Sequence, residues 1–542
     1  MAILETKVLK SSPDYQTNRE DMLSLLDDCR SAEGRVRDNS NSKKGKFEKR
    51  NQMLPRDRLA LLLDRGAPFI ELSSLAGYGM HDDDGKDDVC GGSSITGIGF
   101  VSGVRCMVYV HDSAIKGGAV PPMGVKKALR AQEVALENKL PMVTLAESAG
   151  ANLQYQSELF VDGGRTFANQ AKLSAAGLPQ ITVVHGSSTA GGAYVPGMSD
   201  YVIMVREKAK VFLAGPPLVK AATGEDANDE ELGGADMHYT KTGLAEFIAN
   251  DDAEAISHAR EVMASLNWNR QIDAEAQSGF EEPLYDIDEL CGVVPPDYRK
   301  PYDCREIIAR LVDGSDFTEF KSGYGSEIVA GTASVMGYRV GIIGNNGPIY
   351  PAGSVKAAQF MQLCCQSQTP LLFLQNTTGF MVGKQVEEDG MVKHGSKMIQ
   401  AVATANVPKI TFLIGAAFGA GHYAMCGRSY DPRFIFAWPN NRVAVMGGEQ
   451  AAGVMRIIAE QKFQKMGIEI NEEVSEQLDG AGQVIVDQID RESTALFSTA
   501  HLWDDGIIDP RDSRRLLGEL LSVCQSASQT TLNPNSFGVA RM

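Results

Sequence analysis

The chain has 542 residues, more than one hydrophobic core usually holds, so two or more domains are expected. An apolar content of 43% and a charged content of 22% are typical of a globular protein, and a net charge of −17 argues against a nucleic-acid partner. The nine cysteines include no Cys-x-x-Cys pair, which disfavours a zinc ribbon or a disulfide framework and favours a reducing compartment.

Neither export nor a membrane segment is predicted. The first residues carry no signal-peptide pattern, and no apolar run reaches the length of about 18 residues that a membrane span needs. The acidic stretch of residues 81–89 lacks the ligand spacing of a calcium loop and is predicted to be a surface loop, so no metal site is expected. These features together predict a cytoplasmic protein.

The N-terminal region, residues 1–53, is polar and compatible with helix. It contains a basic patch, for which a solvated surface is the simpler interpretation and a contact for a phosphate or a partner subunit is the alternative. The patch comprises Lys43, Lys44, Lys46, Lys49 and Arg50. Further along, a helix is predicted over residues 55–63, and from Ile95 onward short strands alternate with helices, as in an α/β fold.

A glycine-rich turn follows one of these predicted strands. The apolar run Ile181–Val184 leads into residues 185–194, which read His-Gly-Ser-Ser-Thr-Ala-Gly-Gly-Ala-Tyr. Glycines there let backbone N–H groups approach a ligand oxygen, because no Cβ stands in the way. Two such donors at the start of a helix can stabilise an oxygen that becomes negative during a reaction. The alternative is that the glycines serve only the packing of the turn.

The chain contains this turn twice. The second copy occupies residues 414–423, which lie 229 residues after the first. The same offset relates residues 141–150 to residues 370–379, and a glycine-containing hairpin further upstream recurs at an offset of 234. A register kept over several separate segments is hard to obtain by chance. We therefore predict two copies of one fold, each carrying an oxyanion-type turn.

The domain boundaries follow from this repeat. The first copy is expected within residues 1–270 and the second within residues 300–542. Residues 271–299 contain prolines and aspartates with weak periodicity and are predicted to be a linker. Near the end of the second copy, a polar helix is predicted around residues 455–467.

Six short motifs are spread along the chain, namely Gly191-Gly-Ala-Tyr194, Leu213-Ala-Gly-Pro-Pro217, Glu231-Leu-Gly-Gly-Ala235, Ala420-Gly-His-Tyr423, Met446-Gly-Gly-Glu449 and Asp505-Gly-Ile-Ile-Asp-Pro510. They resemble the β (carboxyltransferase) subunit of biotin-dependent acyl-CoA carboxylases, and the resemblance covers nearly the whole chain. Within that family the chain is most similar to the methylcrotonyl-CoA and geranyl-CoA branch, because Tyr423 stands where propionyl- and acetyl-CoA types usually have Asp. The resemblance implies an α/β fold of two tandem crotonase-like domains, each a spiral of ββα units.

The resemblance implies that the chain moves CO2 from carboxybiotin to an acyl-CoA, with acyl-CoA on the first copy and biotin on the second. Each developing oxyanion then needs its own N–H donors, and a bulky Cβ at Gly192 or Gly421 should block the ligand without unfolding the chain. The residues expected in catalysis are Gly191, Gly192, Ala420 and Gly421. Those expected at the acyl-CoA are Ser148, Gly150, Gly163, Ala168 and Ala190, and those expected at biotin are Gly379, Phe380, Gly419 and Tyr423.

No side-chain base is required, because biotin freed of its carboxyl group can accept the substrate proton. Glu147 is a candidate base, but Asn376 occupies the matching position of the second copy and cannot accept a proton, so a structural role is favoured. Packing or hydrogen bonding is likewise the favoured role of His185 and His422.

The chain also implies a partner. It contains no Ala/Val-Met-Lys-Met biotinylation site, and it has no ATP-binding glycine loop followed by a suitable helix. Biotin is therefore expected on an α subunit that carries biotin carboxylase and biotin carrier domains. The resemblance further implies a homo-oligomer of six β chains within an α6β6 holoenzyme.

The acyl substrate is inferred from Gly163. Methylcrotonyl-CoA types typically read Phe-Gly-Arg where this chain reads Gly-Gly-Arg at residues 163–165, and an aromatic ring there would close the acyl pocket behind a five-carbon substrate. Gly163 therefore favours geranyl-CoA, and Ala168 is expected to widen the same region. The alternatives are methylcrotonyl-CoA, with Gly163 serving only a loop turn, a crotonase-type hydrolase or isomerase, and a non-catalytic scaffold that binds CoA esters.

Overall fold

The computed structural model describes residues 3–81, 90–266, 268, 279–467, 469–534 and 538–539. The chain divides into two compact units, which are described separately below. One unit comprises Arg30–Ala276, Ala500–Leu502 and Val523–Met542, and the other comprises Met1–Cys29, Gln277–Thr499 and Trp503–Ser522. The predicted acidic loop falls almost wholly outside the described residues, as does the first part of the predicted linker.

The first unit is built on a mixed sheet in which eight described strands take part. Strands β1 to β3 are antiparallel, and the strands that follow them in the sheet pair in parallel. Along the sheet the order is β1-β2-β3-β5-β7-β8-β10, with β9 paired to the end of β7. The strands are β1 (Ile70–Leu72), β2 (Ser94–Val101), β3 (Val104–His111), β5 (Met142–Ser148), β7 (Gln180–Thr189), β8 (Tyr201–Val205), β9 (Lys210–Phe212) and β10 (Phe247–Ala249).

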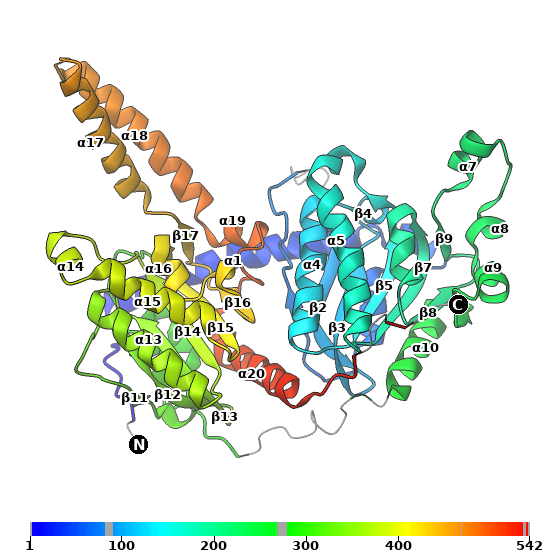
Figure 1. The fold of residues 1–542 in the computed structure, drawn as a ribbon, viewed down its shortest axis with the longest axis horizontal. Helices are drawn as coiled ribbons and strands as arrows, with labels where there is room; N and C mark the ends of the chain where they lie inside the picture. Colours follow the sequence, from blue (N-terminus) through cyan, green and yellow to red (C-terminus); the bar gives the residue numbers. More distant parts are fainter. Residues whose placement is uncertain are drawn as a thin grey trace. The chain divides into compact units, whose positions relative to one another are not determined.

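The two faces of this sheet differ in what they bury. Side chains alternate along a strand, so Val108 and Val110 of β3 face a closed apolar core, which α3 (Pro55–Leu62) and α10 (Asp252–Ser265) complete. Tyr109 and His111 face the opposite side, where α4 (Pro122–Glu137) and α5 (Gln156–Ala175) lie together, as Figure 1 shows. This second face is the one that carries the candidate site.

The second unit repeats the arrangement. Its strands run in the order β11-β12-β13-β14-β15-β16, with β17 paired to the end of β15. An irregularity in strand pairing also recurs. The register shifts between Ala146 and Ser148 in β5 and between Gln375 and Thr377 in β14. The predicted tandem α/β repeat is confirmed. The elements are β11 (Thr318–Glu319), β12 (Ile328–Val335), β13 (Tyr338–Asn345), α13 (Pro351–Gln366), β14 (Leu371–Thr377), α15 (Met391–Thr404), β15 (Lys409–Phe418), α16 (Gly419–Ala424), β16 (Phe434–Ala437) and β17 (Arg442–Ala444).

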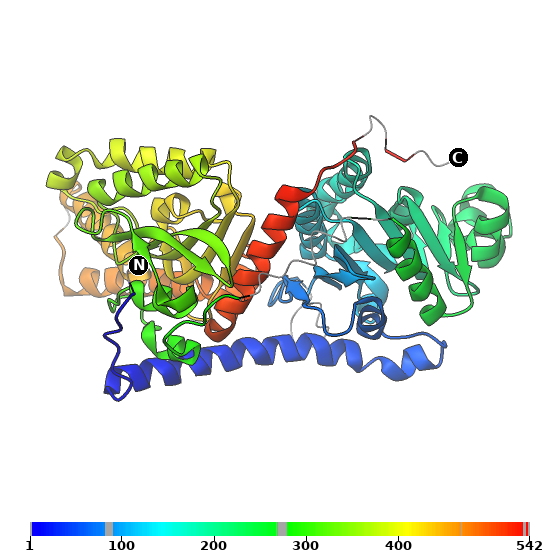
Figure 2. The ribbon, with the colours of Figure 1, turned by 90° about the horizontal axis from the view of Figure 1, so that it is seen from below.

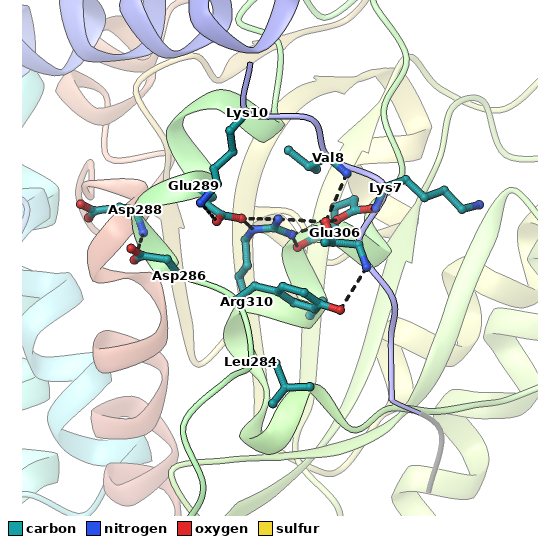
Figure 3. Close-up of polar contacts among 12 residues, drawn as sticks. Lys7, Val8, Lys10, Leu284, Asp286, Asp288, Glu289, Glu306 and Arg310 are labelled. Atoms are coloured by element: carbon teal, nitrogen blue, oxygen red, sulfur yellow. Dashed lines mark hydrogen bonds and ion pairs between the residues drawn. The ribbon is translucent and has the colours of Figure 1, made fainter. Parts of the chain in front are cut away.

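The two ends of the chain do not follow the predicted boundaries. Residues 1–29 group with the second unit, where the hydroxyl of Thr6 and the backbone N–H of Lys7 donate to the carboxylate of Glu306, at 2.6 and 2.7 Å (Figure 3). Glu289 holds the same segment through an ion pair with Lys10 at 2.8 Å. The boundary predicted at the N-terminus was therefore wrong, because the polar segment that opens the chain satisfies buried carboxylates of the later copy.

The converse exchange occurs at the C-terminus, where residues 523–542 group with the first unit. The ammonium of Lys139 donates to the carbonyl of Thr530 at 2.6 Å, and Arg105 donates to Ser526 at 2.8 Å. Two helices contain the exchange points, namely α1 (Pro13–Asn41), which Figure 2 shows in blue as one continuous helix, and α20 (Ser513–Gln529).

The last part of the predicted linker, residues 289–295, is buried rather than loose. Leu290 and Cys291, in α11 (Leu290–Val293), are fully buried. The single polar helix predicted around residues 455–467 is one arm of a helical hairpin, α17 (Gly448–Lys465) and α18 (Glu472–Glu492), drawn in orange in Figure 1. None of the described helices has the length and apolar character needed to cross a membrane.

The shorter elements connect these parts of the two repeats. They are α2 (Lys44–Glu48), β4 (Ala119–Val120), β6 (Gly150–Ala151), α6 (Tyr194–Gly197), α7 (Pro216–Thr223), α8 (Asp229–Gly233), α9 (Ala235–Met237), α12 (Arg305–Leu311), α14 (Lys384–Glu388) and α19 (Ala495–Ala500).

Candidate active site

The two glycine turns begin with the same backbone conformation. In the first unit β7 ends at Thr189, and a 3-10 turn, η3 (Ala190–Ala193), follows; in the second unit β15 runs directly into α16. The first residue of each turn is left-handed, with φ of 52° at Ala190 and 56° at Gly419. An alanine in this conformation costs about 1–3 kcal/mol, so the surrounding structure must hold it there. N–H groups in the first turn of a helix have no intrahelical acceptor, which leaves those of both turns available to a ligand.

A second loop approaches each turn in the same way. The backbone N–H of Gly150 donates to the hydroxyl of Ser148 at 3.1 Å, and that of Gly379 donates to the hydroxyl of Thr377 at 3.1 Å. Both glycines have positive φ, 87° and 120°. The two units therefore each join a left-handed turn to a glycine loop closed by a hydroxyl, which brings together the residues that the sequence repeat predicted.

A cavity of about 660 Å³ extends from the first turn into the space between the sheet and the helix pair α4 and α5. Five of the residues expected at the site line it, namely Ser148, Gly150, Gly163, Gly191 and Gly192. The cavity also reaches Met142 and Gln180, the first residues of β5 and β7, so it follows these strands over most of their length. At about 3.3 Å per residue, the span from Met142 to Ser148 is roughly 20 Å.

Helix α5 forms one wall of this cavity. Phe160, Gly163, Gly164 and Phe167 line it, at the spacing of one helix face. An added Cβ at Gly163 or at Gly164 would meet no atom within 4 Å, so neither glycine is needed for close packing. The interpretation of Gly163 as part of a loop turn was wrong, because both glycines lie inside a regular helix.

Two residues expected at the acyl-CoA are not on the cavity. Ala168 is exposed on α5, one residue beyond the lining Phe167, so it does not widen the acyl region. Ala190 is also exposed and is not among the residues that line the cavity, although its backbone positions Gly191.

The cavity contains polar side chains that the sequence analysis did not single out. His111 and Gln132 both line it and are only 7% and 8% exposed. Burial lowers the pKa of His111 to about 4, although a hydrogen bond to the backbone of Leu145 opposes the shift. The ring is therefore neutral near pH 7. No sequence motif marks either residue, because their proximity arises only when α4 packs against β3.

The second turn is more tightly packed than the first. A Cβ at Gly421 would lie 2.8 Å from Cα of Gly379, whereas a Cβ at Gly192 would have only an ordinary contact, 3.4 Å from Oγ of Ser188. The expectation that a bulky residue at Gly421 leaves the fold intact was therefore wrong, since backbone would have to move. Around this turn, Tyr423 is 44% exposed and stacks on Tyr430, and Phe380 is partly buried against the core of its unit.

The candidate base Glu147 is engaged in a buried ion pair, in which the guanidinium of Arg58 approaches its carboxylate at 2.5 Å. Arg58 also binds Asp252, which in turn contacts Nδ1 of His185 at 2.7 Å. Burial alone would raise the pKa of Asp252, but the hydrogen bond to His185 and the nearby Arg58 lower it to about 2. This cluster braces β5 and β7 beneath the turn, and the structural interpretation of Glu147 and His185 fits it.

In the second unit, Asn376 replaces Glu147 and its side-chain oxygen accepts from the backbone N–H of Ala416 at 2.7 Å. His422 contacts the side chain of Gln375 at 3.2 Å, and burial lowers the pKa of this imidazole to about 4. Within the described ranges, no group of His, Cys, Asp and Glu side chains is arranged to hold a metal ion.

Comparisons with known proteins identify the family of this chain. Residues 46–538 match the carboxyl transferase domain family. The β subunit of geranyl-CoA carboxylase from P. aeruginosa has a similar crystal structure, with a TM-score of 0.92, 55% sequence identity and coverage of 100% of both chains. A probable methylcrotonoyl-CoA carboxylase β chain of Drosophila melanogaster is 47% identical over 560 residues, covering 100% of this chain and 95% of the relative. A probable biotin-dependent acyl-coenzyme A carboxylase β2 subunit of Mycobacterium tuberculosis is 51% identical over 495 residues, covering 91% of each.

Proposed function

From the premise that this chain belongs to the carboxyl transferase family, as the carboxyltransferase (β) subunit of a biotin-dependent acyl-CoA carboxylase, we propose that its substrate is geranyl-CoA. In this proposal the chain carries CO2 to the γ-carbon of a branched α,β-unsaturated acyl-CoA. Methylcrotonyl-CoA is the second candidate, because relatives that are named for it match almost as closely.

The cavity beside the first turn carries this proposal. Its volume of about 660 Å³ and its course along β5 exceed what a five-carbon acyl group fills. Gly163 and Gly164 leave open the space that a larger side chain on α5 would occupy, although glycine inside a helix costs about 0.5–1 kcal/mol relative to alanine. The two glycines cost helix stability and are not required by packing, which supports a role for the open space that they leave in the cavity.

The resemblance to the geranyl-CoA carboxylase β subunit supports the same substrate, since that chain is 55% identical whereas the Drosophila relative is 47% identical. A non-catalytic scaffold is less well supported, because both turns keep the left-handed first residue and the approaching glycine loop.

On the acyl-CoA side, we assign to the N–H groups of Gly191 and Gly192 the stabilisation of the thioester enolate oxygen. Ser148 and Gly150 shape the loop that faces this turn, and Ala190 holds the turn in its left-handed conformation. Removal of one donor from such an oxyanion site costs about 3–4 kcal/mol of transition-state stabilisation. The lowered pKa of His111 makes its ring a weak base and Glu147 is held in an ion pair, so we assign proton removal to a group from outside this chain.

On the second side, we assign Ala420 and Gly421 as N–H donors to the ureido oxygen of biotin. The start of α16 fits this group, because Ala420 is exposed, Gly419 and Gly379 carry no Cβ, and Tyr423 is 44% exposed in the same helix. Phe380 packs against the hydrophobic core of its unit and supports the loop that contains Gly379. Carboxybiotin, when bound, would supply the carboxyl group.

The β subunit of such a carboxylase implies an α partner, and we propose that this partner carries the biotin and the biotin carboxylase activity. We further propose a hexamer of this chain within an α6β6 holoenzyme in the cytoplasm.

The test is a substrate comparison in the holoenzyme reconstituted with its α subunit. Carboxylation of geranyl-CoA with a kcat/KM above that for methylcrotonyl-CoA is expected. An enzyme that carboxylates methylcrotonyl-CoA and ignores geranyl-CoA would refute the proposal.

A further inference from the structure

We propose that the basic segment of residues 43–50 binds the phosphate groups of the CoA nucleotide. The inference rests on the proposed function, because it assumes that the thioester of an acyl-CoA lies at the turn of Gly191 and Gly192. It goes beyond that function by assigning a second contact on the same ligand, at anionic groups far from the reacting carbon.

The segment is strongly cationic in an acidic chain. Residues 43–50 contain five basic side chains and one carboxylate, whereas the whole chain has a net charge of −17. All five basic side chains are exposed, and one of them, Lys44, forms an ion pair with Glu48 at 4.0 Å. Within the described ranges, the other four have no ion-pair partner; they are Lys43, Lys46, Lys49 and Arg50. Like charges three or four residues apart on a helix repel one another, so the segment suits a ligand with several negative charges.

The backbone of this segment is held firmly although its charged side chains are exposed. Phe47, in α2, is 4% exposed and packs against Leu54 and Ala114. Just after the segment, the side-chain amide of Gln52 donates to the carbonyl of His185 in β7 at 3.0 Å. A segment that is already ordered loses little conformational freedom when a ligand binds.

The segment lies at the edge of the sheet that carries the first glycine turn. Strands β3, β5 and β7 are parallel, so their carboxyl ends share this edge. Ala114, which contacts Phe47, comes three residues after the end of β3, and the turn follows the end of β7. β3 is two strands away from β7 in the sheet, a distance of about 10 Å at 4.7–4.9 Å per strand.

The dimensions of CoA match this separation. Its pantetheine arm has about thirteen bonds between the sulfur and the first phosphorus, and when extended it spans roughly 16 Å with bonds of about 1.5 Å. With the acyl chain in the cavity between the sheet and the helix pair, the arm leaves at the edge where the turn lies, and its phosphates come within reach of residues 43–50. The diphosphate and the 3′-phosphate carry about four negative charges, and lysine binds such groups as a point charge.

The first test is a calorimetric titration of the full chain with CoA at an ionic strength of about 0.01 M, where screening is weak. The double variant Lys46→Gln, Lys49→Gln should bind CoA about tenfold more weakly than the wild type, as expected for the loss of two exposed charge contacts. The difference should shrink at about 1 M salt, because the contacts are exposed.

The second test uses the reconstituted holoenzyme and two substrates, geranyl-CoA and the geranyl thioester of pantetheine, which has no phosphate. The same double variant should lower the ratio of kcat/KM for geranyl-CoA to kcat/KM for the pantetheine thioester about tenfold. A folding defect or a lost contact with the partner subunit would lower both values and leave their ratio unchanged.

The matched control is the double variant Lys172→Gln, Lys241→Gln, which makes the same change of net charge in the same unit. Both lysines are exposed and come shortly before the starts of β7 and β10, at the opposite edge of the sheet. This control should keep the CoA affinity of the wild type.

Three results would overturn the inference. Equal CoA affinity of the wild type and of Lys46→Gln, Lys49→Gln would overturn it alone, as would an equal loss of kcat/KM with both thioesters, which would assign the segment to contact with the α subunit. A wild-type chain that binds neither CoA nor geranyl-CoA would overturn the proposed acyl-CoA site as well.

Discussion

Replacement of Gly163 by phenylalanine tests the acyl cavity directly. Gly163 lies inside α5 on the face that lines the cavity, and an added Cβ there would meet no atom within 4 Å. The ring of Gly163→Phe would therefore extend into the cavity rather than into the protein core. Phenylalanine is also the better helix former by a few tenths of a kcal/mol, so the free energy of unfolding should not fall.

The size of the effect follows from the carbons that the ring displaces. A geranyl chain carries five more carbons than a methylcrotonyl chain, and their burial is worth about 4 kcal/mol at about 0.8 kcal/mol per carbon. Exclusion of these carbons should lower kcat/KM for geranyl-CoA by up to about 1,000-fold. The kcat/KM for methylcrotonyl-CoA should change much less, because its short chain ends before the ring.

The assay is incorporation of labelled bicarbonate by the reconstituted holoenzyme with each substrate. Ala168→Phe is the matched control, since it places the same ring on the same helix but on the exposed side. It should leave the ratio of the two kcat/KM values unchanged. An equal loss of both substrates in a folded Gly163→Phe protein, or a shifted ratio in Ala168→Phe, would refute the assignment of this helix face to the acyl chain.

Three further predictions concern the partner, the turns and a buried acid. Purified alone, the chain should fix no bicarbonate with ATP and should become active with a biotinylated α subunit; carboxylation by the isolated chain contradicts this. Gly421→Ala should lower the free energy of unfolding by about 1–3 kcal/mol, whereas Gly192→Ala should not, and equal denaturation midpoints would argue against the close contact at Gly379. Burial raises the pKa of Asp504 to about 6, so the folded state binds a proton that the unfolded state releases at a lower pH. As pH rises from about 4 to about 6, the free energy of unfolding of the wild type should therefore fall by up to about 3 kcal/mol relative to that of Asp504→Asn. A difference between the two proteins that does not depend on pH would contradict this.

The repeat could be predicted because residues at equivalent positions of the two copies make the same interactions. Gly150 and Gly379 share an offset with Ser148 and Thr377, and in both units the hydroxyl accepts from the glycine N–H. Such turns depend on local conformation, which the sequence records directly. The residues named for the acyl side therefore fell largely on one cavity.

The predictions that failed concern features that depend on packing between segments far apart in the sequence. Adjacent glycines usually indicate a turn, so a loop turn was left open as the alternative role of Gly163. Ala168 was assigned to the acyl region by resemblance, and only the packed helix α5 shows that it lies on the exposed side. Gln132 was missed because glutamine on a helix is ordinary, and its unpartnered oxygen is apparent only once α4, α5 and the sheet enclose it.

The exchanged ends of the chain have a consequence for its synthesis. Residues 1–29 are made before the first repeat, but their partner Glu306 is made only after it. The first repeat in turn lacks Ser526 and Thr530 until the second repeat has been made. The first repeat therefore cannot complete its contacts until the second repeat has been made, so its final folding follows the synthesis of both. For the same reason, a cut between the two repeats would deprive each half of a segment that the other half encodes.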